Sequence, residues 1–478
     1  MPVGIGVCSR PSTRGVVCLA MAGLLLLTSA PYAAGQEALP RAQKRPLGRE
    51  VPVYDPASGD PARTMRPPVE EPTGELTLRQ AVALALLHNP GLAAFAWEGR
   101  AREAQMVQVG RRPNPALSIL AEDIGASRQS GAASDAFLQP QTTIQLSQLI
   151  ELGGKRVARL RLASLVRDLA AWDYESARIN VLTEVSRAFT DVLAAQETVA
   201  LTADTTRLLE QVQQSVGLRV ASGVVSPIEE TRASVALASV RVESARAQRT
   251  LESARARLTL LWGSDTPAFT SAAGDLKSAP TPLPRFADLA AQITRSPEIE
   301  RWTTEVSQRE AALAVERSKG VPDVSVVAGY RRFADIGSNA LLFGASIPLP
   351  FFDRNRDAVE AARIRVAKAH EDRRAAETRV AAVLATAYAA LASAHDEVTA
   401  LRSAILPGSQ QTFEAVSEGY RLGRFGYLDV LDAQRTLVGA GSQYLRALAE
   451  YRRAIADVER LIGAPLTEGA AGPSAPKE

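Results

Sequence analysis

The chain has 478 residues, of which 46 % are hydrophobic and only 5 % are aromatic. This composition favours long helices packed through small side chains over a compact aromatic core. The formal net charge is only +3, and acidic and basic residues are interspersed along the chain. Such a charge balance argues against a nucleic-acid partner.

The first 35 residues have the three parts of a secretory signal peptide. Two arginines precede an apolar run over 16–27, and small residues follow at 33–35. The run is too short to span a bilayer, so we expect residues 1–35 to be removed after export from the cytoplasm. Both cysteines, Cys8 and Cys18, lie in this segment, which predicts a mature chain without disulfides or cysteine metal sites.

An internal duplication organises most of the remaining chain. The triplet His-Asn-Pro at 88–90 recurs as Arg-Ser-Pro at 295–297, whereas Gly223 recurs 200 residues later as Gly423. The offset changes from 207 to 200 between residues 115 and 149, which indicates an insertion in the first copy. The predicted organisation is a signal peptide (1–35), a proline-rich N-terminal arm (36–74), a first repeat (75–263), a linker (264–285), a second repeat (286–463) and a disordered tail (464–478).

Each repeat is predicted to contain a helix, two strands, a long helix and a returning helix. Residues 155–216 lack glycine and proline and place apolar residues at three- and four-residue steps. These 62 residues predict a helix about 93 Å long with coiled-coil packing. Ser226-Pro-Ile-Glu229 predicts a helix start with a reciprocal serine–glutamate cap, and Pro407-Gly408 predicts a kink. The long and returning helices are expected at about 152–218, 226–262, 354–419 and 427–462.

Four segments alternate between apolar and small or polar residues, as strands with one apolar face do. They are expected at about 115–124, 141–150, 323–333 and 340–349. About ten residues is the length of a strand that spans a membrane, although soluble hairpins show the same alternation. A sheet in lipid must close, and four strands are too few, so three copies would supply twelve. The predicted fold is mainly α with a membrane β-barrel portion: a trimeric 12-stranded barrel continued by a long α-helical coiled-coil barrel.

Each long helix and its returning helix form a helical hairpin, and the turns at the ends of these two hairpins, the hairpin tips, resemble those of a known family. Gly223-Val-Val-Ser-Pro-Ile-Glu-Glu and Gly423-Arg-Phe-Gly-Tyr-Leu-Asp-Val-Leu-Asp-Ala-Gln are similar to the tips of TolC-like outer-membrane factors. Gln148-Leu-Ile-Glu-Leu-Gly-Gly-Lys-Arg156 is similar to the CzcC-type, heavy-metal efflux branch. The resemblance implies a homotrimer in outer-membrane lipid with a long periplasmic extension. It also implies passive conduction of substrate, heavy-metal cations in this branch, from an inner-membrane RND pump through a periplasmic adaptor, or membrane fusion protein.

The resemblance further implies roles for residues at the tips. Asp429 and Asp432 match acidic residues that narrow the periplasmic entrance, and three copies would place six carboxylates there. Acids near a helix N-terminus also complement its dipole, and capping alone would account for Glu229. The family's gate arginine is replaced by Phe425. The expected pore and gate residues are Asp429, Asp432, Glu229, Tyr420 and Arg424, and the expected adaptor-docking residues are Gly223, Val224, Ser226, Gly423, Phe425 and Gly426.

Chemistry typical of enzymes and metal sites is not found in the sequence. The three histidines, His88, His370 and His395, are scattered, and no phosphate-binding loop or nucleophile–base motif stands out. We therefore expect no catalytic residue, no bound metal and no cofactor. The alternatives within the family are a drug-efflux or a type I secretion channel. A periplasmic adaptor or a structural coiled-coil protein would be a different class, with less need for two hairpins or for paired strands.

Overall fold

The computed structural model describes residues 70–122, 140–278, 280–334 and 337–466. The predicted signal peptide, most of the arm and tail, and part of the segment that carries the predicted insertion lie outside these residues. The elements up to the end of the first repeat are β1 (Glu75–Thr77), α2 (Leu78–His88), α3 (Pro90–Val109), β2 (Ala116–Glu122), β3 (Gln141–Ile150), α4 (Lys155–Ala221) and α5 (Pro227–Leu260). The remaining elements are β4 (Ser271–Ala273), α6 (Phe286–Gln292), the 3-10 turn η2 (Ile293–Arg295), α7 (Pro297–Lys319), β5 (Val324–Phe333), β6 (Asn339–Ser346), α8 (Arg356–Ala400), the π turn η3 (Leu401–Ile405), α9 (Leu406–Arg421) and α10 (Tyr427–Ile462).

Helix α3 of the first repeat and helix α7 of the second repeat begin in the same way. The Asn89 side chain caps α3 by accepting a hydrogen bond from the Leu92 N–H at 2.9 Å. Ser296 caps α7 in the same manner, accepting from the Ile299 N–H at 3.4 Å. A proline follows each cap as the first helical residue, where its missing N–H costs no hydrogen bond. The recurring tripeptide is therefore a helix-start signal in both repeats.

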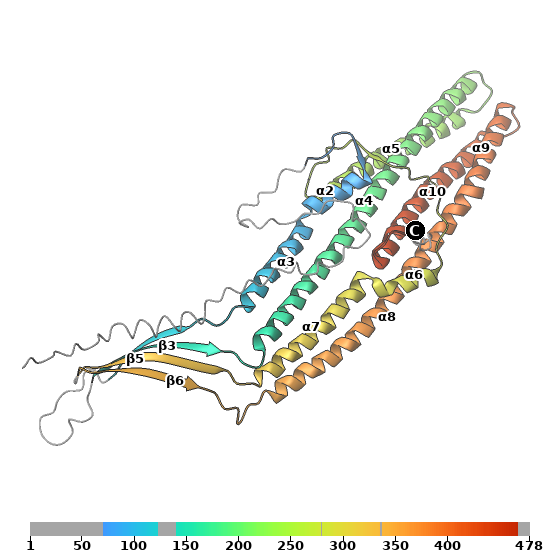
Figure 1. Cartoon of the computed structure of the whole chain (residues 1–478). Helices are drawn as coiled ribbons and strands as arrows, with labels where there is room; N and C mark the ends of the chain where they lie inside the picture. Colours follow the sequence, from blue (N-terminus) through green and yellow to red (C-terminus); the bar gives the residue numbers. More distant parts are fainter. Residues whose placement is uncertain (1–69, 123–139, 279, 335–336, 467–478) are drawn as a thin grey trace, which may run out of the picture. The chain divides into compact units, whose positions relative to one another are not determined.

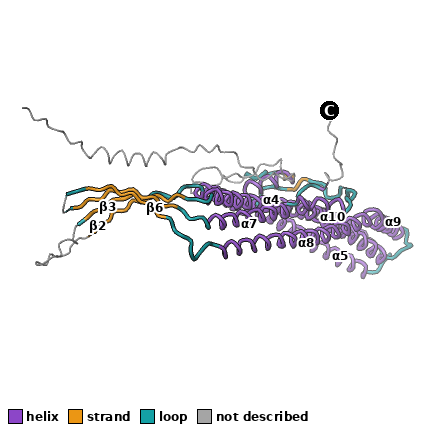
Figure 2. The backbone as a smooth tube through the Cα atoms, turned by 60° about the horizontal axis from the view of Figure 1, so that its bottom comes forward, coloured by secondary structure: helices purple, strands orange, loops and turns teal. Residues whose placement is uncertain are grey.

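Four strands form one antiparallel sheet in the order β2-β3-β5-β6. The strands lie together beyond one end of the helices (Figure 2). Each repeat contributes one hairpin, and β3 of the first repeat pairs with β5 of the second from Gln141–Phe333 to Ile150–Val324. Within the described chain, β2 and β6 are edge strands with one unpaired side each. The sheet is therefore open.

The helices connected to the strands lie side by side in the same order as the strands themselves. Near the sheet, α3 packs on α4, α4 on α7, and α7 on α8. Towards the other end of α4, α5 packs on α4, α4 on α10, and α10 on α8 and α9 (Figure 1). The 67 residues of α4 correspond to about 100 Å, so α4 runs as one uninterrupted helix from the sheet to the turn before α5. No helix in the described residues has both the length and the apolar composition needed to cross a membrane.

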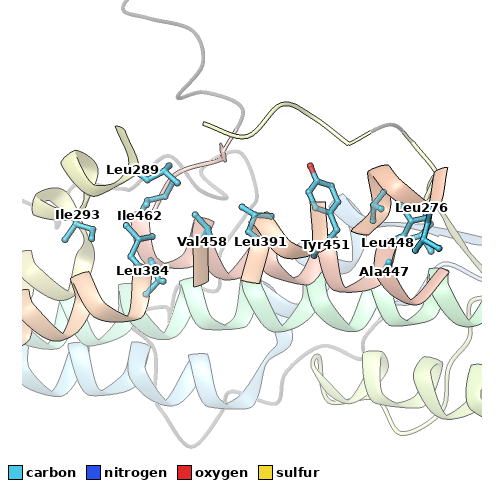
Figure 3. Packing of buried hydrophobic residues seen from close by; sticks show 14 of the residues in the cluster. Leu276, Leu289, Ile293, Leu384, Leu391, Ala447, Leu448, Tyr451, Val458 and Ile462 are labelled. Carbon is cyan, nitrogen blue, oxygen red and sulfur yellow. The ribbon is translucent and has the colours of Figure 1, made fainter. Parts of the chain in front are cut away.

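Two apolar cores lie between these helices, one for each repeat. The first contains Phe189 of α4 and Trp262, which follows α5. The second combines Leu391 of α8 and Tyr451 of α10 with Leu276 of the linker (Figure 3). Both cores include linker residues, so the linker is part of the folded structure.

The end of the predicted N-terminal arm takes part in this packing. Glu71 accepts hydrogen bonds from the Trp262 indole at 2.7 Å and from the Ala268 N–H at 2.9 Å. Strand β1 then pairs in parallel with β4, which lies in the linker. Residues 70–74, at the end of the predicted N-terminal arm, are therefore fixed by contacts with the linker.

The interruption predicted at Pro407-Gly408 takes the form of a π turn. Between α8 and α9, residues 401–405 form η3, and Pro407 lies in the first turn of α9. A proline inside a helix removes one backbone hydrogen bond and collides with the preceding turn, and a π turn relieves this collision. The corresponding part of α4 has no such interruption.

Candidate functional site

One face of the four-stranded sheet is apolar and exposed. The strand register aligns the side chains of this face in two rows, Ile119, Ile144, Tyr330 and Leu341, and Leu117, Leu146, Ala328 and Phe343. Phe343 is 72 % exposed and Ile119 is 67 % exposed. Soluble monomers seldom leave a contiguous apolar surface uncovered, so this face is suited to lipid or to another apolar partner.

The opposite face, called the polar face below, carries most of the polar side chains of the sheet, alongside Leu120, Val327 and Leu342. Its rows contain Glu122 with Gln141, Thr143 with Arg331, and Ser118 with Gln145. Because side chains alternate along each strand, this face and the apolar face are separated strictly by register. The sheet can therefore separate an apolar phase from water.

The Glu-Leu-Gly-Gly-Lys-Arg motif lies where the sheet meets the helices. Glu151 forms a double hydrogen bond with Arg159, at 2.6 and 2.8 Å. Lys155 forms an ion pair with Asp323 at 2.7 Å, which joins the start of α4 to the segment before β5. Gly153 has a φ of +68°, and a Cβ there would lie 2.7 Å from Val321. The motif thus fixes the junction between the two repeats, and its glycine is required by backbone conformation and by close packing.

The two hairpin tips have the same backbone turn. Gly223 and Gly423 both have a φ of +73°, a conformation that favours glycine. In each tip the N–H after the glycine donates to the carbonyl oxygen five residues earlier, at 2.9 Å in the first tip and 2.7 Å in the second. This hydrogen bond closes the end of the helix.

A small apolar cluster joins the two hairpins next to their tips. We call it the tip cluster; it consists of Val212, Val216 and Val220 of α4, Ala233 and Ala236 of α5, Tyr420 of α9, and Tyr427 and Leu431 of α10. Tyr427 is only 2 % exposed, and its ring centroid lies 6.1 Å from that of Tyr420. The hairpins are therefore held together by aromatic side chains of the second repeat and small apolar side chains of the first.

Charged groups of the first hairpin surround the two tyrosines. The Arg219 guanidinium lies 4.4 Å from the centroid of the Tyr420 ring. One carboxylate oxygen of Glu229 and the hydroxyls of Tyr420 and Tyr427 are buried without a hydrogen-bond partner among the described residues. Burial, the neighbouring Tyr420 and the Glu229 charge raise the pKa of Tyr427 to about 12. Burial also raises the pKa of Tyr420, as does Glu229, while Arg219 acts in the opposite direction.

The predicted acidic residues have different environments in the structure. Glu229 does not cap α5 reciprocally: Ser226 accepts from the Ile228 N–H at 3.4 Å, and the Glu229 carboxylate lies by the tip cluster. The predicted reciprocal cap was wrong, because the carboxylate is held among the tyrosines of the other hairpin. Asp429, in contrast, caps α10 by accepting from the Gly426 N–H at 2.8 Å.

Asp432 lines a groove between α5 and α10, next to the tip cluster. The groove has a volume of about 450 Å³ and also contains Arg232, Val235, Leu428 and Arg435. Asp432 forms no ion pair with any residue in the described ranges. Its carboxylate is exposed, as is that of Asp429, so both remain accessible to an ion or a partner.

The remaining predicted tip residues are mostly exposed. Val224 is 64 % exposed and Phe425 is 47 % exposed. The Phe425 ring lies against Gly419, where an added Cβ would come within 2.2 Å of it. Arg424 is exposed, and the cation found over the Tyr420 ring is Arg219 instead. In the described part of the chain, no group of three or more His, Cys, Asp and Glu side chains could hold a metal ion.

Sequence reasoning missed two members of this site, Arg219 and Tyr427. Arg219 lies one helical turn before Gly223, on the same hairpin as Glu229. A basic residue there and an aromatic residue at the first position of the returning helix were visible signals, but the contact between hairpins was not.

Comparison with known proteins agrees with this architecture. The model of the family described as "Outer membrane efflux protein" matches residues 81–264 and 290–464. The chain belongs to the outer membrane efflux protein family. Family membership places this efflux protein in the outer membrane and excludes the adaptor and the structural coiled coil.

Relatives of the efflux protein include metal resistance proteins. The cobalt-zinc-cadmium resistance protein CzcC of Cupriavidus metallidurans is 35 % identical over 424 residues, covering 87 % of this chain and 98 % of CzcC. The nickel-cobalt-cadmium resistance protein NccC of Alcaligenes xylosoxydans xylosoxydans is 29 % identical, covering 69 % and 71 % of the two chains. A crystal structure of CusC has the same fold, with a TM-score of 0.67 at 18 % identity over 81 % of this chain and 92 % of CusC.

Proposed function

We propose that three copies of the chain form an outer-membrane channel that passively conducts heavy-metal cations out of the cell. The cations reach it from an inner-membrane RND pump through a periplasmic adaptor. The observation that carries this proposal is the open, two-faced sheet, whose apolar face suits lipid and whose polar face suits a water-filled pore. The metal substrate is supported by the 35 % identical relative CzcC, which is a cobalt-zinc-cadmium resistance protein.

The number of strands supports a trimer. Within the described residues, one sheet has four strands and two unpaired edges, and unpaired edges cannot persist within lipid. Two copies would give eight strands, and a barrel of that size has an interior just wide enough for side chains. Three copies give twelve strands and leave room for a water-filled pore.

The tips are the proposed periplasmic entrance. Asp429 and Asp432 lie three residues apart on one helix and are both exposed, so three copies would present six carboxylates to a passing cation. Tyr420 joins the hairpins through the tip cluster, and the Glu229 carboxylate lies beside that cluster. Arg424 lies outside that cluster, which leaves it accessible at the mouth.

The exposed residues of the tips are the proposed docking surface for the adaptor. Val224 and Phe425 supply apolar contacts, and the turn residues Gly223, Gly423 and Gly426 allow close backbone approach. Ser226 is part of the same surface through its position at the start of α5.

Deleting the gene and restoring it on a plasmid would test the substrate. We expect the deletion to lower tolerance to zinc, cobalt, cadmium or nickel and restoration to recover it, with drug tolerance as the control. Unchanged metal tolerance together with raised drug sensitivity would contradict the metal proposal.

The acidic entrance has its own test. Asp429→Ala combined with Asp432→Ala should lower the cation preference measured in planar bilayers. Unchanged ion selectivity would remove both residues from the pore.

Export of a small organic molecule is the second candidate function. A 25 % identical relative is the pyoverdine export outer membrane protein OpmQ of Pseudomonas aeruginosa. The same deletion strain distinguishes the two candidates, because small-molecule export predicts metal tolerance equal to that of the parent strain.

A further inference from the structure

Two adjacent arginines near the end of β5 lie on opposite faces of the sheet. Arg331 pairs in register with Thr143 and shares the polar face with it. Arg332 pairs with Thr142 on one side and with Asn339 on the other, on the apolar face. Neighbouring residues of a strand point to opposite faces, so the two arginines face different surroundings although they are consecutive.

The Arg331 guanidinium is held over the polar face. Its Nε donates to the Thr143 hydroxyl at 2.9 Å, and Thr143 is only 2 % exposed. Its Nη2 lies 3.9 Å from a Glu122 carboxylate oxygen. The hydrogen bond fixes the position of the charge, while the longer contact to Glu122 only partly compensates it.

These two residues dominate the charge of the polar face. Among the described residues of β2, β3, β5 and β6, Glu122 and Arg331 are the only charged side chains on that face. Their neighbours in the adjacent rows are uncharged, namely Ser118, Gln141 and Gln145. Any ion that passes along this face therefore meets one positive and one negative group per chain.

We propose that Arg331 determines the ion selectivity of the barrel end of the pore and that Glu122 is its counter-charge. The proposal rests on the proposed channel function, in which the polar face lines water. Arg331 opposes the passage of cations, and Glu122 reduces that opposition. Three copies would place three such pairs around the pore, where fixed charges of one sign concentrate ions of the other sign.

The test is the cation-to-anion permeability ratio of the purified full-length channel in planar bilayers. Measurements at about 0.01 M salt keep the Debye length near 30 Å, so fixed charges act across the pore. A unit charge about 10 Å from an ion in water changes the ion's local concentration about twofold. One such charge lowers the local cation concentration and raises the local anion concentration about twofold each, so Arg331→Gln should raise the cation-to-anion permeability ratio at least about fourfold, and Glu122→Gln should lower it by a similar factor.

Arg332→Gln is the matched control, because it removes the same charge from the next residue on the other face. It should leave the permeability ratio unchanged. Equal ratios for the parent, Arg331→Gln and Glu122→Gln would overturn the proposal while leaving the channel intact. Absence of any conductance in the parent would instead contradict the channel function itself.

Thiol labelling gives a second readout that does not depend on selectivity. The only cysteines, Cys8 and Cys18, lie in the predicted signal peptide, so the mature chain offers a cysteine-free background. A charged thiol reagent that cannot cross membranes should reduce the conductance of Arg331→Cys and leave Arg332→Cys and the parent unaffected. The reverse pattern would place the apolar face in the pore and would overturn the proposal.

Discussion

The two hairpin tips share a backbone but differ in their side chains. Each has a glycine at a φ of +73° and the same closing hydrogen bond. Arg219 in the first tip corresponds to Gly419 in the second, and Glu229 corresponds to Asp429. In the first tip, the Arg219 and Glu229 side chains lie next to the tyrosines of the other hairpin. In the second tip, the Phe425 ring packs against Gly419, and Asp429 caps its own helix.

The difference shows how a duplicated element becomes complementary to itself. The first tip contributes charges and the second contributes aromatic rings, so the contact between them pairs unlike surfaces. Two identical tips would place like charges or like rings together. The local opening of the tips, followed by hydrogen–deuterium exchange, is a direct measure of this contact.

Removing the aromatic partner should have the largest effect. Tyr427→Ala should lower the free energy of local opening at the tips by about 3–5 kcal/mol, because the ring is almost completely buried. Tyr427→Phe should change it little, since the hydroxyl is buried without a partner. Leu428→Ala is the control, as Leu428 is 56 % exposed. A small effect of Tyr427→Ala would mean that the rings do not hold the tips together.

High pH should loosen the same contact. The folded-state pKa of Tyr427 is raised to about 12 from the ordinary value of 10, so the folded state retains a proton that the unfolded state loses. The stabilisation is complete below pH 10 and disappears as the pH rises towards 12, a loss of up to about 3 kcal/mol. Tyrosinate absorbance and helical circular dichroism, recorded together, should show a transition that Tyr427→Phe shifts to higher pH. Coincident curves for the two proteins would contradict it.

Replacing the two corresponding acids by amides should affect the stability of the tips differently. Asp429→Asn should lower the free energy of local opening by about 0.5–1 kcal/mol, because a charged cap at the start of α10 is lost. Glu229→Gln should cost nothing or should stabilise the tips, since it removes a negative charge whose buried oxygen lacks a partner. Exchange rates of the α5 and α10 amides report each effect separately. Equal destabilisation by both substitutions would show that the two tips are equivalent after all.

The contact between Arg219 and Tyr420 should contribute the least. A double-mutant cycle with Arg219→Met and Tyr420→Leu should give a coupling of about 0.5–1 kcal/mol, the usual range for a cation over an aromatic ring. A parallel cycle with Arg424→Met and Tyr420→Leu is the control and should show no coupling. Strong coupling to Arg424 would restore it as the partner of the tyrosine.

Features set by local sequence were predictable from the chain alone. The tripeptides at 88–90 and 295–297 specify helix starts, and Gly223 and Gly423 specify the tip turns. The alternation of the strands likewise indicates which residues share a face. The register between β3 and β5 was not visible, because it joins residues about 180 positions apart and depends on how the repeats pack.

The candidate site was predictable in its location and only in part in its contacts. Tyr420 and Glu229 were expected at the tips and are found near each other there. Arg219 was missed because its contact is made across two hairpins, which no helical period reveals. Strands of three residues, such as β1 and β4, carry too little alternation to be recognised.

The order β2-β3-β5-β6 has a consequence for how a ring would be assembled. One free edge comes from the first repeat and the other from the second, so neighbouring chains would meet head to tail. The seam between β6 and the next chain's β2 would then be a second version of the seam between β3 and β5. A half-length ancestor with a single repeat would offer the same pair of edges, and six such chains could close the same ring. Duplication thus halves the number of separate molecules that must meet and makes half of the seams intramolecular.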